Sequence, residues 1–411
     1  MIQKRRWAAT ALLVAVLAIN PAFGVVSTRE IDAVRQKALV DNDVLEDSDF
    51  EVIDAFWAAA IEELFISEDF SEIVNIRTEI FTRRGGPEPT QYSVSFISSA
   101  KKHLKSAFEE VQKWDADRRK TLIERNLMIL TAQLENADLL ELGMQMLWHE
   151  NGIVRYWAVK SVTNSSIVGQ LNAELSSDAE LATRIATRLD TVAEKETYPE
   201  ILDLIAGFAE QVNVPRAKQL LLKIVDLRTK AYENWTVKYE RMDAELLRFL
   251  GNEILSETSE QDKAVISLKF AQLYSYVMQR YILGANTLSN VSKQQLASVL
   301  VEVEQSVLDR LLGRPQSTIK KAVEKILTKK TPEQKDYSTL EREHDSLFGT
   351  PTRAGQLAAA LNFDYGKNPD DSPGTAPKKL GPPPEEQPET EAAESQSEAT
   401  EPEAEAAETS G

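Results

Sequence analysis

Residues 139–162 read LLELGMQMLWHENGIVRYWAVKSV, and this stretch decides the fold class. An apolar segment is followed by the short polar turn His149-Glu150-Asn151, and then by a second segment whose apolar residues recur every three or four positions. Such spacing places the apolar side chains on one face of a helix, whereas a strand would alternate apolar and polar residues. The stretch therefore predicts two helices joined by a tight turn.

Apolar residues of helical period occupy most of residues 28–330. Leu296, Leu300, Val303, Val307 and Leu311, for example, follow one another at spacings of four, three, four and four. The same pattern runs through residues 50–65, 100–114, 121–134, 139–148, 153–162, 181–192, 201–208, 217–227 and 264–281. The nearest approach to a strand, YSVSF at 92–96, leads directly into a helical stripe. We therefore expect an all-α chain, either an α-solenoid of helical hairpins or an irregular helical bundle.

The helix pair at 139–162 resembles one HEAT repeat, because Val154-Arg155, Ala158 and Val162 follow the polar turn. The resemblance implies that Arg155 reaches an acidic or carbonyl partner in the turn of its own or the neighbouring repeat. It also implies that Ala158 permits close helix approach and that Val154 and Val162 pack inward. The usual aspartate of the turn is replaced by Glu150 and Asn151, and the pattern matches clearly in this one unit only. A solenoid needs about three stacked units or more, for which the chain has room.

The N-terminus has the order of a secretory signal peptide. Lys4, Arg5 and Arg6 precede an apolar run from Trp7 to Ile19, and small residues around Gly24 offer a cleavage site. A membrane-spanning helix needs about 20 apolar residues, which makes an uncleaved anchor the lesser alternative. We expect cleavage near Gly24 and a mature protein without a stable membrane anchor.

The chain of 411 residues contains no cysteine. This excludes disulfides, thiolate metal sites, a cysteine nucleophile and a lipid anchor on an N-terminal cysteine. A secreted eukaryotic chain of this length commonly carries disulfides, so the absence favours a bacterial envelope, with the protein in the periplasm or secreted.

Composition changes abruptly near residue 345. Nine of the 16 prolines lie from Pro351 onward, and residues 381–411 carry ten glutamates and no lysine or arginine. We expect a helical body over 25–335 with an optional subdivision near 250–262, a linker over 336–380 with an apolar island at 350–366, and a disordered acidic tail. Since the whole chain carries −18, residues 25–380 keep a net charge of about −11, which argues against nucleic acid or an anionic membrane as partner.

Motifs for catalysis, metal binding or nucleotide binding are mostly absent from the sequence. His103, His149 and His344 are isolated in sequence, and each is expected at the surface or in a turn. The acidic stretch at 41–51 fails the calcium-loop pattern, and Asp47 or Ser48 is expected to cap a helix instead. Nucleotide-binding and nucleophile-elbow motifs are missing as well. No metal, cofactor or catalytic residue is predicted, although an enzyme whose site is assembled from distant helices stays open.

Two segments are candidate interaction surfaces. Tyr232, Trp235 and Tyr239 are spaced to share one helix face, which could stack on a sugar ring or bind a partner's apolar side chain; the alternative is core packing. Within the apolar island, Leu357, Leu361 and Phe363 could form a peptide that docks on a partner. The alternative for the island is a terminal helix that folds back onto the body.

Three functions follow from these features. The preferred hypothesis is an exported, periplasmic helical-repeat scaffold or adaptor that binds a protein partner, since extended helical repeats expose long surfaces. The second is an α/α-type enzyme that acts on carbohydrate or lipid. The third is a passive structural component of the envelope, with the acidic tail as a spacer.

Overall fold

The computed structural model describes residues 28–40, 44–86, 89–174, 179–329, 336–367 and 373–384 of the chain. The predicted signal peptide and nearly all of the predicted acidic tail lie outside these residues. Within them the fold is all-α, as predicted, and the two short strands β1 (Gly349–Thr350) and β2 (Arg353–Ala354) form a single hairpin. None of the described helices is long and apolar enough to cross a membrane.

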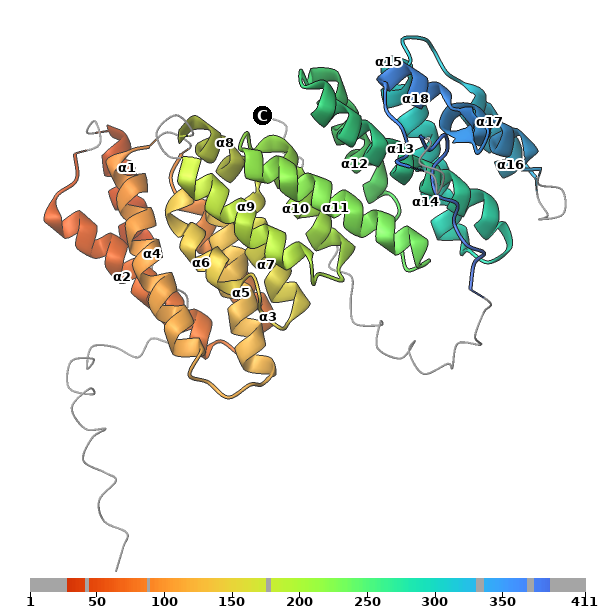
Figure 1. Cartoon of the computed structure of the whole chain (residues 1–411). Helices are drawn as coiled ribbons and strands as arrows, with labels where there is room; N and C mark the ends of the chain where they lie inside the picture. The colour runs from red at the N-terminus through yellow and green to blue at the C-terminus, as the bar shows by residue number, and fades with distance from the viewer. Residues whose placement is uncertain are drawn as a thin grey trace, which may run out of the picture. The chain divides into compact units, whose positions relative to one another are not determined.

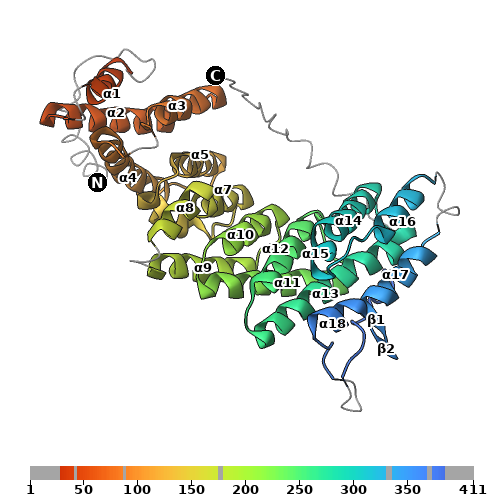
Figure 2. The same cartoon turned by 90° about the horizontal axis from the view of Figure 1, so that it is seen from above.

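The chain divides into two compact units, residues 1–220 and 221–411. The first unit contains α1 (Arg29–Val40), α2 (Asp47–Ile66), α3 (Phe70–Thr82), α4 (Gln91–Val111), α5 (Arg118–Leu134), η1 (Ala137–Leu139), α6 (Leu140–Met146), α7 (Gly152–Thr163), α8 (Ser165–Glu174), α9 (Ala179–Ala193), α10 (Pro199–Gln211) and the start of α11 (Pro215–Glu233). Its helices succeed one another in space in chain order, from α1–α4 through α5–α7 to α8–α10 (Figure 1; Figure 2).

Local sequence signals fix where several of these helices begin. Asn151 accepts hydrogen bonds from the backbone N–H groups of Ile153 and Val154, and so caps α7. Pro199 and Pro215 occupy the first turn of α10 and α11, where a missing N–H costs nothing. The predicted cap of α2 is displaced by one residue, because Glu46 precedes the helix and forms a reciprocal capping box with Asp49.

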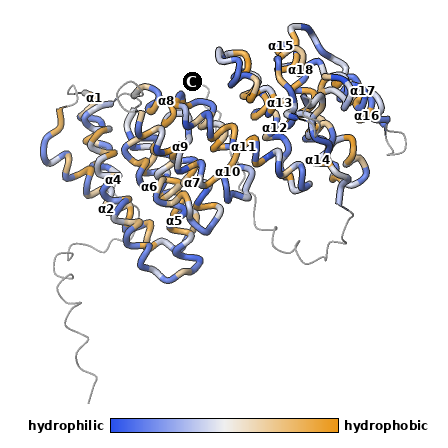
Figure 3. The backbone as a smooth tube through the Cα atoms, in the orientation of Figure 1, coloured by the Kyte–Doolittle hydropathy of each residue, from blue (hydrophilic) through white to orange (hydrophobic). Residues whose placement is uncertain are grey.

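Helix α7 forms the centre of the first unit, where it packs against α5, α6 and α10. Val154, Ala158 and Val162 are fully buried in it. Each helix turns one apolar stripe towards its neighbours and a polar stripe towards solvent, visible as alternating colours along the tube in Figure 3. A side chain on Gly143 of α6 would meet Ser161 Oγ at 2.1 Å, so α6 and α7 approach closely only because this residue is glycine.

The second unit is built around α13 (Glu260–Leu283), which packs against α12 (Met242–Ser256), α14 (Asn290–Val303), α17 (Ser338–Phe348) and α18 (Gln356–Leu361). The unit also contains the end of α11, the β1–β2 hairpin, η2 (Gly284–Asn286), η3 (Glu304–Leu308), α15 (Asp309–Leu311) and α16 (Thr318–Leu327). The predicted subdivision near 250–262 is wrong, since that range joins α12 and α13, which pack together in one unit.

The predicted linker over 336–380 also needs correction. Its described residues form α17, the β1–β2 hairpin and α18, and these pack onto α13. Leu357 and Leu361 are buried in α18, and Phe363 is half-buried with its ring 5.2 Å from that of Tyr365. The alternative for the apolar island, a terminal helix folded back onto the body, is therefore what the structure shows. The many prolines of this region indicate only that its helices are short. They do not indicate whether its residues are buried against the rest of the protein.

Candidate functional site

Arg155 connects two successive helical hairpins of the first unit. Its Nη1 donates to the carbonyl oxygens of His149 (2.7 Å) and Glu150 (3.0 Å), within the turn before its own helix. Its Nε and Nη2 donate to the two carboxylate oxygens of Glu196 (2.9 and 3.0 Å), which lies in the loop between α9 and α10. Arg155 thus makes both kinds of contact expected of it, a carbonyl contact in its own turn and an acidic contact in the next hairpin.

The carboxylate of Glu196 is held from three sides. The backbone N–H groups of Thr197 and Tyr198 donate to its Oε1, and its side chain is only 1% exposed. Burial alone would raise the pKa of Glu196, but the hydrogen bonds from Arg155 and the backbone outweigh it, and the pKa is lowered. The pKa of Arg155 is raised by the same pair. The arrangement therefore keeps both groups charged and fixes the loop that carries Tyr198.

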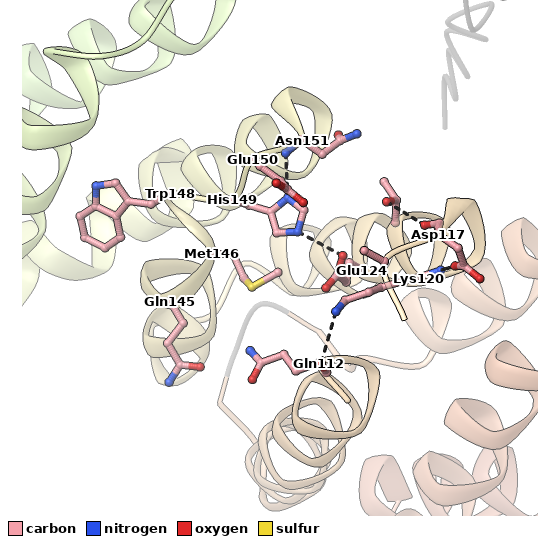
Figure 4. Close-up of a pocket in the computed structure, with 12 residues that line it drawn as sticks. Gln112, Asp117, Lys120, Glu124, Gln145, Met146, Trp148, His149, Glu150 and Asn151 are labelled. Carbon is pink, nitrogen blue, oxygen red and sulfur yellow. Dashed lines mark hydrogen bonds and ion pairs between the residues drawn. The ribbon is translucent and has the colours of Figure 1, made fainter. Parts of the chain in front are cut away.

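A cavity of about 850 Å³ opens beside this turn, between the end of α4, the start of α5 and the end of α6 (Figure 4). Its polar lining includes Asp117, Lys120, Glu124, His149 and Glu150. Lys120 donates to the backbone carbonyls of residues 112 and 114, and Asp117 caps α5 through the N–H of Lys120. The lining thus carries three carboxylates and one ammonium group, and its net negative charge favours a cationic ligand group.

His149 and Glu124 form a pair at the wall of this cavity. The imidazole Nε2 lies 3.1 Å from Glu124 Oε2, and Nδ1 accepts a hydrogen bond from the backbone N–H of Asn151 at 3.1 Å. Nδ1 therefore carries no proton, which places the proton on Nε2, facing the carboxylate. Both ring nitrogens are engaged, so His149 has none left to take a proton from a substrate. His149 lies in a turn, as predicted, and serves there to hold Glu124, which is 3% exposed.

Large apolar side chains remain exposed along the same edge. Trp148 is 47% exposed, Ile153 53% and Tyr198 50%. The Tyr198 ring lies over Gly152, where an added Cβ would come within 2.6 Å of it, and the Arg155 guanidinium lies 5.6 Å from its centre. In Figure 4, Trp148 points away from Glu124 and His149, on the other side of the turn. An apolar edge, defined here as Trp148, Ile153 and Tyr198, thus borders an acidic cavity.

Comparison with known proteins assigns no family. No family model matches this chain, and no curated protein matches it. One solved structure that matches is described as an engineered protein of the Northeast Structural Genomics Consortium, with 11% identity over 81% of this chain and 99% of the other, and a TM-score of 0.20. A TM-score this low does not indicate a shared fold. The candidate site therefore rests on its own geometry.

The predicted aromatic ridge does not exist as a helix face. Helix α11 ends at Glu233, and Trp235 and Tyr239 have left-handed backbone angles (φ 57° and 53°) that break the helical spacing. Tyr232 is fully buried and donates its hydroxyl hydrogen to Asp243 at 2.6 Å, while Tyr239 is 38% exposed. The three residues therefore do not form one exposed helix face, and the alternative, core packing, holds for Tyr232.

Asp243 is the centre of a buried polar network that fixes this irregular segment. Arg228 donates to both of its carboxylate oxygens at 2.7 Å and also to the carbonyl oxygen of Lys238 at 3.0 Å. Burial opposes the charge on Arg228, but Asp243 outweighs it and the pKa is raised. Burial beside Asp243 raises the pKa of Tyr232 as well, so its hydroxyl stays protonated. The network is a structural clamp that holds the segment after α11 against α12.

Ser275, His344 and Asp345 have the order of a nucleophile, a base and an orienting acid. Ser275 Oγ lies 2.8 Å from His344 Nε2, and His344 Nδ1 lies 3.5 Å from Asp345. Ser275 is fully buried in the middle of α13, where the helix's own hydrogen bonds occupy the neighbouring N–H groups and leave none for an oxyanion. This trio is structural. The prediction of a surface or turn position is wrong for His344, whose side chain is 12% exposed within α17.

The third histidine, His103, lies in α4 with its side chain 17% exposed and its Nε2 2.9 Å from Asp54. Among the described residues no group of three or more histidines, aspartates and glutamates is placed to hold a metal ion.

Sequence reasoning missed Glu124 and Glu196. A signal existed for Glu124, which interrupts the apolar run of α5 at a position that faces the core, whereas Glu196 has no local signal in its loop.

Proposed function

We propose that this chain is an exported, HEAT-like helical-repeat scaffold that binds a protein partner through the apolar edge of its first unit. The observation that carries the proposal is the exposure of Trp148, Ile153 and Tyr198 at the turns of two neighbouring hairpins, beside an acidic cavity. Exposed apolar patches mark interaction sites, and aromatic side chains such as Trp and Tyr are frequent anchors of protein interfaces. The clamp from Arg155 to Glu196 supports the HEAT-like assignment, because it joins neighbouring hairpins through their turns.

The chemistry of the site selects a class of partner. A partner with a lysine or arginine would place this cation in the cavity lined by Asp117, Glu124 and Glu150, and a large apolar side chain elsewhere on its surface would pack on Trp148, on the other side of the turn. Rigid placement favours such binding, since the edge is fixed by Arg155 and the backbone-bonded Glu196. The signal-peptide pattern, which lies outside the described residues, supports a periplasmic location for this encounter.

The test is affinity capture from native envelope by the tagged full chain and by two matched variants. The first carries Trp148→Ala and Ile153→Ser. The second carries Leu255→Ser and Val291→Ser, which replace side chains of comparable exposure (46% and 62%) in the other unit. We expect a stoichiometric protein that the chain and the second variant retain and the first variant loses, with binding weakened by added salt.

Two results would overturn the proposal. Retention of the same partner by the Trp148→Ala, Ile153→Ser variant would remove the apolar edge as its site. The absence of any stoichiometric partner at every salt concentration would remove the scaffold function itself. Circular dichroism of each variant is the control for folding.

The second candidate, a carbohydrate- or lipid-acting α/α enzyme, is favoured by one observation. Glu124 is nearly buried in the cavity wall, paired with His149 through one carboxylate oxygen. A single carboxylate in a cavity could act as an acid or base. Hydrolysis of envelope glycans or lipids by the full chain, lost in Glu124→Gln, would establish it.

The third candidate, a passive envelope component, would be favoured if neither a partner nor a turnover were found.

A further inference from the structure

Residues 373–384, PGTAPKKLGPPP, follow α18 and lie against the second unit as an extended segment, here called the strap; its end is the blue coil that runs into the grey trace in Figure 1. It has no helix or strand beyond the single bridge at Pro373. Its buried residues are Gly374, Pro377 and Leu380, one in every three. A buried position at every third residue is the periodicity of a polyproline II helix, which has three residues per turn.

The backbone of the strap is held by side chains of the second unit. Gln279 of α13 binds it twice: its Oε1 accepts from the N–H of Leu380 at 2.8 Å, and its Nε2 donates to the carbonyl of Lys378 at 3.2 Å. Gln272, two turns earlier on the same helix, accepts from the N–H of Lys378 at 3.2 Å. The indole Nε1 of Trp235 donates to the carbonyl of Gly381 at 3.1 Å.

These contacts are the chemistry by which proteins recognise extended peptides. A polyproline II segment has no internal hydrogen bonds, so its N–H and C=O groups are free to pair with amide and indole side chains of a groove. Leu380 supplies the apolar anchor, 7% exposed, and Lys378 lies 3.8 Å from the carboxylate of Glu233. Side chains that bind a peptide in this way recognise its backbone N–H and C=O groups and the spacing of its buried residues. No pairing of β-strands is needed.

The strap is tethered locally at its start. The N–H of Tyr365 donates to Gly374, and the N–H of Gly374 donates to Gly366, which closes the loop that follows α18. Beyond Gly374, the backbone of the strap is bound within the described residues by the side chains of Gln272, Gln279 and Trp235, and the Thr375 hydroxyl donates to the carbonyl of Thr350 at 2.8 Å. None of these contacts is a backbone hydrogen bond within a helix, so the stretch from Ala376 to Pro384 can leave the groove without opening any helix of the unit.

We propose that the groove formed by Gln272, Gln279 and Trp235 is a recognition site for an extended, proline-flanked peptide with the spacing Pro-x-x-Leu-Gly, and that the strap occupies it in cis as a displaceable cover. A partner segment of the same chemistry binds in trans when the strap leaves. This site lies in the second unit and is independent of the apolar edge. A partner peptide cannot bind while the strap fills the groove. The apparent affinity of the groove for that peptide is therefore lowered in proportion to the fraction of molecules whose groove is empty.

The test uses the full chain and a fluorescent peptide of residues 375–384. Wild-type chain is compared with a strap variant that carries Pro377→Ala and Leu380→Ser, and with the strap variant that also carries Gln279→Ala. We expect the strap variant to bind the peptide at least about tenfold more tightly than the wild type, because its groove is empty. The added Gln279→Ala should abolish this gain, and a peptide with Leu380→Ser should not bind.

A folded strap variant that binds the peptide no better than wild type overturns the proposal, since the strap would then be a permanent part of the core. If the strap variant fails to fold, amide hydrogen exchange of the wild-type chain decides. We expect the Leu380 amide to exchange at least about tenfold faster than the buried amides of α13, as a separate local opening requires. Equal exchange rates for the strap and α13 would overturn the proposal.

Discussion

Arg155 and Glu196 are joined by two parallel hydrogen bonds of 2.9 and 3.0 Å, and the same guanidinium binds the carbonyls of the turn before α7. One side chain thus couples the α6–α7 turn to the loop before α10. Neighbouring helical hairpins contact each other mainly through apolar faces, which tolerate some sliding. A bidentate pair at the turns removes this freedom, because the planar fork accepts only one relative placement.

Arg155→Ala should destabilise the first unit by about 3 kcal/mol, because it leaves the buried Glu196 carboxylate without its partner. Native-state hydrogen exchange of α7 amides measures this local stability. Arg248→Ala is the matched control, since Arg248 pairs with Glu245 on an exposed surface, and it should cost less than about 1 kcal/mol. Equal effects of the two substitutions would contradict the assigned role of Arg155.

Gly152→Ala should displace the Tyr198 ring, because the new Cβ would lie 2.6 Å from it. We expect a lower melting temperature and a changed Tyr198 environment, visible by NMR. Gly169→Ala in α8 is the matched control, since a Cβ there meets nothing within 4 Å. It should stabilise the protein by up to about 1 kcal/mol through helix propensity. A rise in melting temperature for both variants would show that Tyr198 does not pack on Gly152.

His344 should make the second unit less stable in acid. Burial lowers its pKa below 6.5, with Asp345 acting against this and Lys379 adding to it. Between the two pKa values the unfolded chain binds a proton at His344 and the folded chain does not. The contribution of neutral His344 to the stability of the fold is therefore full above pH 6.5 and is lost as the pH falls through 6.5 towards the folded pKa. Urea denaturation of wild type and His344→Gln between pH 5 and 8 measures it. The variant should lose less stability over this range, and parallel curves would contradict the prediction.

Leu357→Ala should destabilise the second unit by about 2–4 kcal/mol, because Leu357 is fully buried among the packed helices. Phe363→Ala should cost less, since Phe363 is half-buried, with its ring 5.2 Å from that of Tyr365. Chemical denaturation followed by circular dichroism gives both values. If Leu357→Ala were neutral for stability, the apolar island would return to its predicted role as a free docking peptide.

Repeating apolar spacing was sufficient to predict the helices of residues 50–65, 121–134, 201–208 and 264–281, since each stripe lies within a helix of the structure. It was insufficient for α3 and α12, whose stripes were overlooked, and for α17 and α18, which lie in a proline-rich region. Proline limits helix length, but it does not report whether a segment such as 373–384 is buried against another part of the chain.

The candidate sites show the same division. Arg155 could be assigned from its pattern, because the turn that it binds is adjacent in sequence. The aromatic ridge failed, since the spacing of Tyr232, Trp235 and Tyr239 indicates a common face only if the helix continues, and α11 ends at Glu233. Gln272 and Gln279 carried no signal at all, because their partners lie about a hundred residues further along the chain.

The sequence by itself determined the all-α class, the α6–α7 hairpin and the acidic, cysteine-free character of the chain, because helix formation and composition depend on residues near one another. Tertiary structure alone decided the partner of Arg155, the cavity beside Glu124, the burial of Leu357 and the seat of the strap. Each of these depends on which distant segments meet, and pairing between distant segments is set by the packing of whole helices rather than by any local pattern.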